Sequence, residues 1–239
     1  MEMPVSSTTV EAPKRDASLG FRGLYEVLAS PVSFFTRLKD DPKVLVPYVV
    51  YMILIVVFLI ATSGFIAQMQ LDELQRRAAD NPTLAVPSEM TADKLVPFIV
   101  IFGALTWALS PLVIAALVYL WGNFIMAGRS SFKQLLSVVL YGEFIFILGG
   151  ILSLPLMMAK QSVLVSFSLA ALVPPDPKSV LWVALSKVGV FEIWEIIAVG
   201  IGLAILYNFP RNKGYLLAVL SVGLVSTLHV LLTAVSSMF

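Results

Sequence analysis

One stretch of the sequence, Leu181 to Lys213, constrains the fold more than any other. It is longer than the roughly 20 apolar residues that a helix needs to cross a bilayer, yet its apolar run contains Lys187, Glu192 and Glu195. A charged side chain near the bilayer centre costs at least ~2.5–3.5 kcal/mol. We therefore expect this stretch to form one membrane helix that turns its charged flank toward the interior of a helix bundle.

The composition indicates an integral membrane protein. Hydrophobic residues make up 59% of the chain and charged residues 13%, whereas an average soluble domain has roughly a quarter charged residues. The net charge of +1, without a long basic run, gives no reason to expect a nucleic-acid partner. With no cysteine and one histidine, neither a disulfide framework nor a thiolate metal site can form. No metal and no other cofactor is expected.

The N-terminal part of the sequence is predicted to lie outside the membrane. Residues 1–18 are rich in Ser, Thr, Pro and charge and are interpreted as a disordered cytosolic tail. Residues 19–43 form an amphipathic interfacial segment, within which Ser30 and Pro31 are predicted to begin a helix. We expect its apolar side chains to dip into the lipid and its basic ones to meet the headgroups, while binding of a soluble partner stays open. The residues assigned to this surface are Phe21, Arg22, Phe34, Phe35, Arg37 and Lys39.

Residues 44–239 are interpreted as a membrane domain with five transmembrane helices, so the predicted fold class is an all-α integral membrane protein. The first of these helices is expected to continue beyond the membrane through Gln68 to Ala79. The run Val163 to Val173 is too short to span and is predicted to be a short re-entrant or interfacial segment before the fourth span. The five predicted spans are residues 44–67, 96–127, 132–158, 181–213 and 215–236.

The distribution of lysine and arginine predicts the orientation, because cytoplasmic loops carry an excess of both. With the N-terminus inside and the C-terminus outside, the inner segments hold most of these residues. The inner set is Lys14, Arg15, Arg22, Arg37, Lys39, Lys43, Arg129, Lys133, Arg211 and Lys213, and the outer set is Arg76, Arg77, Lys94, Lys160 and Lys178.

Five ionisable residues in the predicted spans form the candidate site, an intramembrane polar cluster of Glu143, Lys187, Glu192, Glu195 and His229. At about 1.5 Å per residue, Glu143 lies roughly 16 Å from the inner end of its helix, and Glu192 about as far from the outer end of its own. Both are expected near the bilayer midplane, with Lys187 and His229 nearer the outer face. On one continuous helix, Lys187, Glu192 and Glu195 would share a wedge of roughly 140°.

Three interpretations of this cluster stay open. Its carboxyls could hydrogen-bond between helices, bind a proton or a cation, or bind a lipid or peptide headgroup. Glu143, Glu192, Glu195 and His229 could supply enough metal ligands, but nothing in their spacing requires a metal. The sequence contains no phosphate-binding glycine loop, nucleophile elbow or metalloprotease signature. An enzyme is therefore the least favoured class; an intramembrane one would need a water-accessible cavity joining Glu143, Glu192 and His229.

Several motifs together resemble the Yip family, membrane proteins named for interaction with Ypt/Rab GTPases and also present in bacteria. Tyr141 and Gly142 are similar to the family's tyrosine-glycine motif, whereas Glu143 after them departs from the eukaryotic form and favours a bacterial member. The other motifs are Ser30-Pro31 through Phe34-Phe35 to Pro42 and Pro47, the run Gly128 to Gly142, Phe191 to Trp194, and Arg211 to Gly214. The resemblance implies a cytosolic N-terminal segment, five spans and oligomers within the membrane.

The leading functional prediction is a non-enzymatic Yip-type membrane protein that organises or binds partners, either membrane lipids, other membrane proteins or further copies of itself. A GTPase partner follows only by family analogy. The alternative is a proton- or cation-coupled transporter or channel that uses Glu143, Glu192, Glu195 and Lys187. The expected location is the cytoplasmic membrane of a bacterium, with a eukaryotic Golgi or ER membrane as the alternative.

Overall fold

The computed structural model describes residues 19–81, 87 and 89–236. The predicted tail, residues 1–18, lies outside the described residues. The side chain of His229 does too, although its backbone belongs to a described helix.

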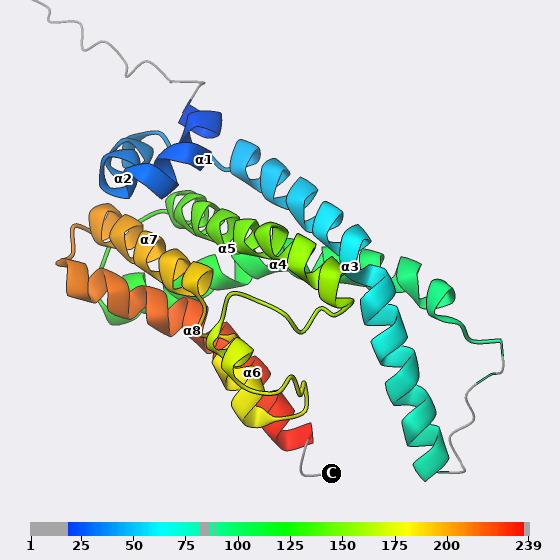
Figure 1. Ribbon diagram of the computed structural model, residues 1–239. Helices are drawn as coiled ribbons and strands as arrows, with labels where there is room; N and C mark the ends of the chain where they lie inside the picture. Colours follow the sequence, from blue (N-terminus) through cyan, green and yellow to red (C-terminus); the bar gives the residue numbers. More distant parts are fainter. Residues whose placement is uncertain (1–18, 82–86, 88, 237–239) are drawn as a thin grey trace, which may run out of the picture.

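The described chain is helical throughout, which confirms the predicted all-α class (Figure 1). The α-helices are α1 (Leu19–Ala29), α2 (Pro31–Asp40), α3 (Leu45–Asp80), α4 (Ala92–Tyr119), α5 (Phe132–Lys160), α6 (Val180–Ser186), α7 (Val190–Tyr207) and α8 (Arg211–Ser236). A π-helical turn, η1 (Leu120–Ile125), continues α4, and a short 3-10 helix, η2 (Leu169–Leu172), precedes α6.

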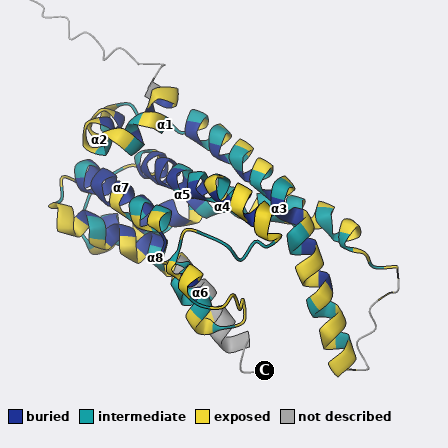
Figure 2. Cartoon of the chain, in the orientation of Figure 1, coloured by how far each residue is buried: buried dark blue, intermediate teal, exposed yellow. Residues whose placement is uncertain are grey.

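Helix α5 is the centre of the bundle. It packs against α3, α4 and α7, and α7 packs in turn against α2 and α8. Figure 2 shows α5 and α7 as the most continuously buried helices, whereas the end of α3 is largely exposed. Four described helices are long and apolar enough to cross a membrane: α3, α4 with η1, α5 and α7.

The connections gather at two opposite ends of the bundle. At one, called here the α2 end, the Lys39 ammonium donates to the Asn208 side-chain oxygen at 2.7 Å, and the Gln134 amide donates to the Lys39 carbonyl at 2.9 Å. These contacts bring α2, the α4–α5 turn and the α7–α8 turn together, so the basic segments that the sequence assigns to one membrane side do share one end. The other, called the α6 end, contains α6 and the loop that precedes it.

Helix α2 packs into the protein core instead of lying on lipid. Phe34 and Phe35 are both 0% exposed. The Phe34 ring contacts the Tyr141 ring edge-on at 4.6 Å between centroids, and the Tyr141 hydroxyl donates to the Gly20 carbonyl at 3.0 Å. The prediction that Phe34 and Phe35 dip into the membrane is therefore wrong, because α5 and α7 cover the apolar face of α2. Phe21 on α1 does remain exposed.

The predicted continuous helix from Leu181 to Lys213 is also wrong, since the chain forms α6 and α7 with a break between them. At the break, the Leu169 amide donates to the Val188 carbonyl and the Val190 amide donates to the Phe167 carbonyl, at 2.9 and 3.0 Å. This pairing surrounds an antiparallel bridge between Ser168 and Gly189. The run predicted to be re-entrant is thus a loop, partly η2, whose backbone pairs with the chain just before α7.

Two local predictions are confirmed. Helix α3 continues to Asp80, beyond the predicted span, and α2 begins at Pro31 with Ser30 at the N-cap position. The 36 residues of α3 make a helix about 54 Å long, against a hydrocarbon core of about 30 Å. The segment after Ala67 therefore projects past the membrane at the α6 end.

Candidate functional site

Two carboxyl side chains meet in the middle of the bundle. Glu143 of α5 is 3% exposed and Glu195 of α7 is 4% exposed. The Cγ atom of Glu195 lies 3.5 Å from the point where a Cβ on Gly142 would stand, so Glu195 rests on the turn of α5 that carries Glu143, and the two carboxyls interact electrostatically. Counted along their helices, they lie roughly 16 and 18 Å from the α2 end. We call Glu143 and Glu195 the acidic pair.

The acidic pair has few polar neighbours. The Ser110 hydroxyl of α4 donates to the Glu143 carboxyl at 3.1 Å. The Tyr51 hydroxyl of α3 lies near both carboxyls, within hydrogen-bond reach of Glu143, and also meets the Trp107 carbonyl at 3.1 Å. Among the residues whose side chains are described, none donates a hydrogen bond to Glu195, and neither carboxyl has a basic partner within ion-pair distance. Glu195 is thus a buried carboxyl without an ion-pair partner or a hydrogen-bond donor among the described side chains.

The sequence predicts Glu192 near the bilayer midplane, and the structure places it near the start of α7, which begins at Val190. Glu192 is in the first turn of α7, and its carboxylate folds back so closely over Gly189 that a Cβ there would collide with it. A carboxylate is stabilised at this position by the helix dipole. Glu192 is therefore one helical turn nearer the α6 end than Glu195.

Lys187 lies in the turn before α7, so the predicted common flank of Lys187, Glu192 and Glu195 is wrong for this lysine. Burial lowers the pKa of Lys187, and the neighbouring Glu192 carboxylate partly opposes that shift. Of the predicted polar cluster, the structure brings Glu143 and Glu195 together and leaves Lys187 in a loop. Within the described part of the chain, no group of three or more Asp, Glu, His or Cys side chains could hold a metal ion.

The sequence prediction missed Tyr51 and Ser110. Each is one of several hydroxyl side chains in its predicted span, which is a weak signal, because serine and tyrosine occur in membrane helices for many reasons. Only the packing of α3 and α4 against α5 places the two hydroxyls beside Glu143.

The two residues of the family motif have packing roles. The Tyr141 hydroxyl joins α5 to α1 through the Gly20 carbonyl. A Cβ on Gly142 would overlap Cγ2 of Val199, so glycine at this position allows α5 and α7 to approach closely. Gly149 does the same where Phe191 crosses it. Small residues thus permit close helix packing at these positions.

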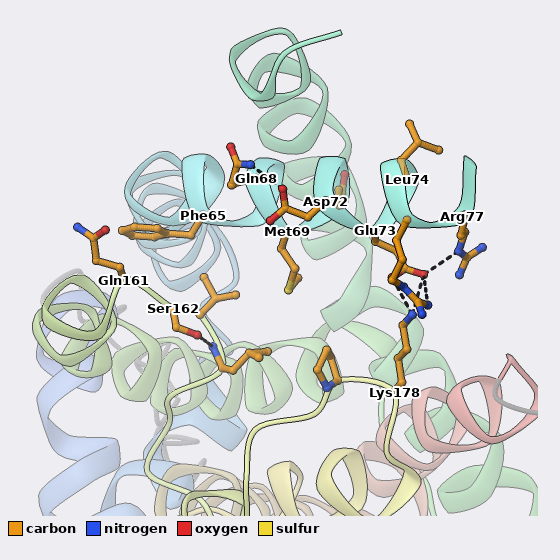
Figure 3. A pocket seen from close by; sticks show the side chains of 15 residues that line it. Phe65, Gln68, Met69, Asp72, Glu73, Leu74, Arg77, Gln161, Ser162 and Lys178 are labelled. Carbon is orange, nitrogen blue, oxygen red and sulfur yellow. Dashed lines mark hydrogen bonds and ion pairs between the residues drawn. The ribbon is translucent and has the colours of Figure 1, made fainter. Parts of the chain in front are cut away.

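A second candidate site lies at the α6 end, where the projecting part of α3 faces the loop before α6. The cavity between them measures about 830 Å³ and has Phe65, Met69 and Leu164 in its wall (Figure 3). Glu73 connects its two sides, since it accepts hydrogen bonds from Lys178 at 2.7 Å and from Arg77 at 2.8 Å. Hydrogen bonds from Arg76, Lys178 and Arg77 hold the pKa of Glu73 well below its usual range.

The contact between Glu73 and Lys178 should resist mild acid. Because the pKa of Glu73 is lowered in the folded chain, its contribution is fully present above the ordinary glutamate value of about 4.3 and is lost only as the pH falls through the lower folded value. The sequence has no cysteine, so spin labels on Leu74→Cys and Pro177→Cys would report this contact by pulsed electron spin resonance. We expect one short distance from pH 7 down to about pH 4.3, and a broader distribution in Glu73→Gln already at pH 7. Equal distributions in both proteins would contradict the prediction.

Comparison with known proteins agrees with this architecture. An all-helical chain with several apolar helices, and with polar groups buried among them, belongs to the class of multi-pass membrane proteins. The family model of the Yip1 domain matches residues 25–234. The chain therefore belongs to the Yip1 domain family. The resemblance identified from the sequence motifs is confirmed.

One curated relative is the membrane protein YknW of Bacillus subtilis (strain 168). It is 24% identical to this chain over 204 residues, which cover 84% of this chain and 85% of the relative. No solved structure gives a significant match.

Proposed function

We propose that this chain is a non-enzymatic membrane protein that organises or binds partners, protein or lipid, through helix α1. The observation that supports this most is a pair of exposed aromatic side chains: Phe21 is 66% exposed and Tyr25 72% exposed, one helical turn apart. The opposite side of α1 is held against the bundle, since Val27 is fully buried and Gly23 lies against the Phe34 ring. A rigidly held aromatic pair of this kind suits a binding surface better than a mobile tail would.

Charged groups border this surface. Arg22 and Arg37 both pair with Glu26, at 3.2 and 2.5 Å, and the two arginine side chains are 65% and 45% exposed. Aromatic side chains beside arginine are the composition found at the centres of protein interfaces and also at membrane surfaces.

A photo-crosslinking amino acid at position 25 tests the binding role. In cells, we expect it to give adducts that a matched probe at Phe98 does not give, because Phe98 is 61% exposed on the membrane-spanning part of α4. The variant Phe21→Ser should weaken the position-25 adducts without loss of folded protein, since Phe21 makes no core contact. Identical adducts from the probes at positions 25 and 98 would show that α1 is not the binding element.

The proposed topology has five spans, with α8 as the fifth, the N-terminus inside and the C-terminus outside a bacterial cytoplasmic membrane. Two observations support α8 as a span: it starts at the α7–α8 turn of the α2 end, and it contacts α6 at the opposite end. Its 26 residues make a helix about 39 Å long, enough to cross the membrane.

Single cysteines test this topology, because the chain has none of its own. A membrane-impermeant maleimide should label Gln75→Cys and a cysteine added after Phe239 in intact cells, but label Ser33→Cys only after lysis. A C-terminal cysteine protected in intact cells would mean four spans. Labelling of Ser33→Cys in intact cells would reverse the orientation.

A second candidate function, proton- or cation-coupled transport, is favoured by the buried acidic pair, which has no basic partner among the described side chains. Its test is flux in proteoliposomes, with Glu143→Gln and Glu195→Gln compared with the parent chain. Flux unchanged in both variants would remove the acidic pair from any transport role.

A further inference from the structure

A cavity lies one helical turn from the acidic pair, on the side of the α6 end. It measures about 170 Å³. Helices α3, α4, α5 and α7 each supply one polar residue at the level of the acidic pair, and each also supplies a cavity-wall residue one helical turn away from it. These residue pairs are Tyr51 and Ile55 on α3, Ser110 and Trp107 on α4, Glu143 and Ile147 on α5, and Glu195 and Glu192 on α7. Helices α3 and α5 run toward the α6 end and α4 and α7 run away from it, so all four displacements point in the same direction. The cavity therefore leads from the acidic pair toward the α6 end.

The wall of this cavity is mostly apolar but has three polar side chains. Glu192, Ser153 and Ser166 contribute them, and Ser166 comes from the loop before η2. A water molecule occupies about 30 Å³ in the liquid and needs two to four polar partners in a protein interior. The cavity is large enough for a short chain of water molecules that leads from Glu192 toward the acidic pair, whose own carboxyls do not line it.

Toward the α2 end, by contrast, most side chains beyond the acidic pair are apolar and buried, and the hydroxyl of the buried Ser137 donates to the Lys43 carbonyl at 2.6 Å. Val139 and Leu140 of α5 and Val199 and Leu203 of α7 are each 0–1% exposed. Beyond them, Phe34 and Phe35 of α2 close the bundle. Helices α1 and α2 thus complete an apolar barrier on this side.

The two neighbouring carboxylates of the acidic pair need a bound proton or cation to offset their mutual repulsion. Among the described side chains, the titratable groups near the pair are Tyr51 from α3, Glu192 from α7 and, next to Glu192, Lys187 from the preceding loop. Ser110 of α4 is neutral. Two ionised carboxylates would repel each other in a low-dielectric interior with no cation between them. Glu195 is 4% exposed and accepts no hydrogen bond from the side chains that the structure describes, so its carboxyl is the candidate acceptor for a proton.

We propose that the acidic pair is a proton-binding site that is loaded from the α6 end through this cavity and is closed toward the α2 end. One proton binds a carboxylate oxygen of Glu195, and the resulting O–H donates to the Glu143 carboxylate. The pair then carries one negative charge, which the Ser110 hydroxyl stabilises. Calcium would need six to eight oxygen ligands, more than this site offers, whereas a proton needs one acceptor. Glu192 relays protons at the entrance of the cavity.

This inference goes beyond partner binding by α1 and does not depend on it, while the transport candidate would use the same site. Infrared difference spectroscopy of the full chain in lipid nanodiscs tests it. A pH step should reveal the C=O band of one protonated carboxyl that is lost at high pH, absent in Glu195→Gln, and absent or shifted in Glu143→Gln. The control Glu73→Gln, outside the membrane, should keep the band. A spectrum without such a band at any pH, or one unchanged in Glu195→Gln, would overturn the proposal.

The direction of loading is a separate measurement on oriented proteoliposomes. A pH jump on the α6 side should titrate the band, and a jump on the α2 side should not. Ser153→Leu, which fills the cavity, should slow the response at least tenfold, and Glu192→Gln, which keeps the shape, should slow it as well. Equal responses from both sides, or full speed in both variants, would overturn the proposed path. Crosslinking at position 25 should be unaffected by these changes, so the two proposals fail independently.

Discussion

Replacing Phe34 by alanine should destabilise the protein by about 3–5 kcal/mol, the usual cost of truncating a buried phenylalanine. Phe34 is 0% exposed, packs edge-on against Tyr141 and lies beside Gly23 of α1. Its removal leaves a cavity between α1, α2 and α5 that the surrounding helices can fill only partly. Reversible unfolding in mixed micelles, followed by circular dichroism, would measure the free-energy difference.

The matched control for this prediction is Phe21→Ala. Phe21 is 66% exposed on the neighbouring helix, so its truncation should change the free energy of unfolding by no more than about 0.5 kcal/mol. If Phe34→Ala and Phe21→Ala changed the free energy of unfolding equally, α2 would not be packed into the core as described. The prediction that Phe34, like Phe21, contacts lipid would then be correct.

Replacing Gly142 by alanine should cost about 1–3 kcal/mol, because the added methyl group would overlap Val199 and force α5 and α7 apart. These two helices carry the acidic pair, so we also expect the infrared band of the pair to shift. The same unfolding experiment measures the loss of stability.

Two further variants make this prediction specific. Gly64, on α3, has no atom within 4 Å of an added Cβ, so Gly64→Ala should be neutral or stabilise the helix by up to about 1 kcal/mol. The double variant Gly142→Ala with Val199→Ala should be less destabilised than the sum of its two single variants, because the second change removes the overlapping methyl group. Additive losses would show that the two residues do not touch.

Several features could be predicted from the residues alone because their causes are local. The start of α2 at Pro31 follows from the Ser30-Pro31 pair, and the continuation of α3 to Asp80 follows from a helical pattern that ends at Asn81. The membrane class follows from composition, since long apolar runs of this kind have few other uses. The importance of Glu143 and Glu195 follows from the cost of placing carboxyls in hydrocarbon.

Other features could not be predicted in this way because their causes are distant in the chain. The amphipathic pattern of α2 is the same whether its apolar face meets lipid or protein, and only the position of α5 and α7 decides that Phe34 and Phe35 are buried. The break before α7 depends on hydrogen bonds between residues 167–169 and 188–190, which no helical periodicity reveals. The sequence prediction consequently assigns Lys187 to the fourth span, whereas the structure places it in the turn before α7.

The sequence by itself determined that this protein is a helical membrane protein with carboxyl groups kept inside, because hydrophobicity and the cost of buried charge are properties of the residues. The tertiary structure alone decided which carboxyls meet. Glu143 and Glu195 become a pair, with Tyr51 and Ser110 beside them, only because four helices cross at one level. That arrangement depends on side-chain packing between distant segments, such as Gly142 against Val199, which has no counterpart in the linear order of the chain.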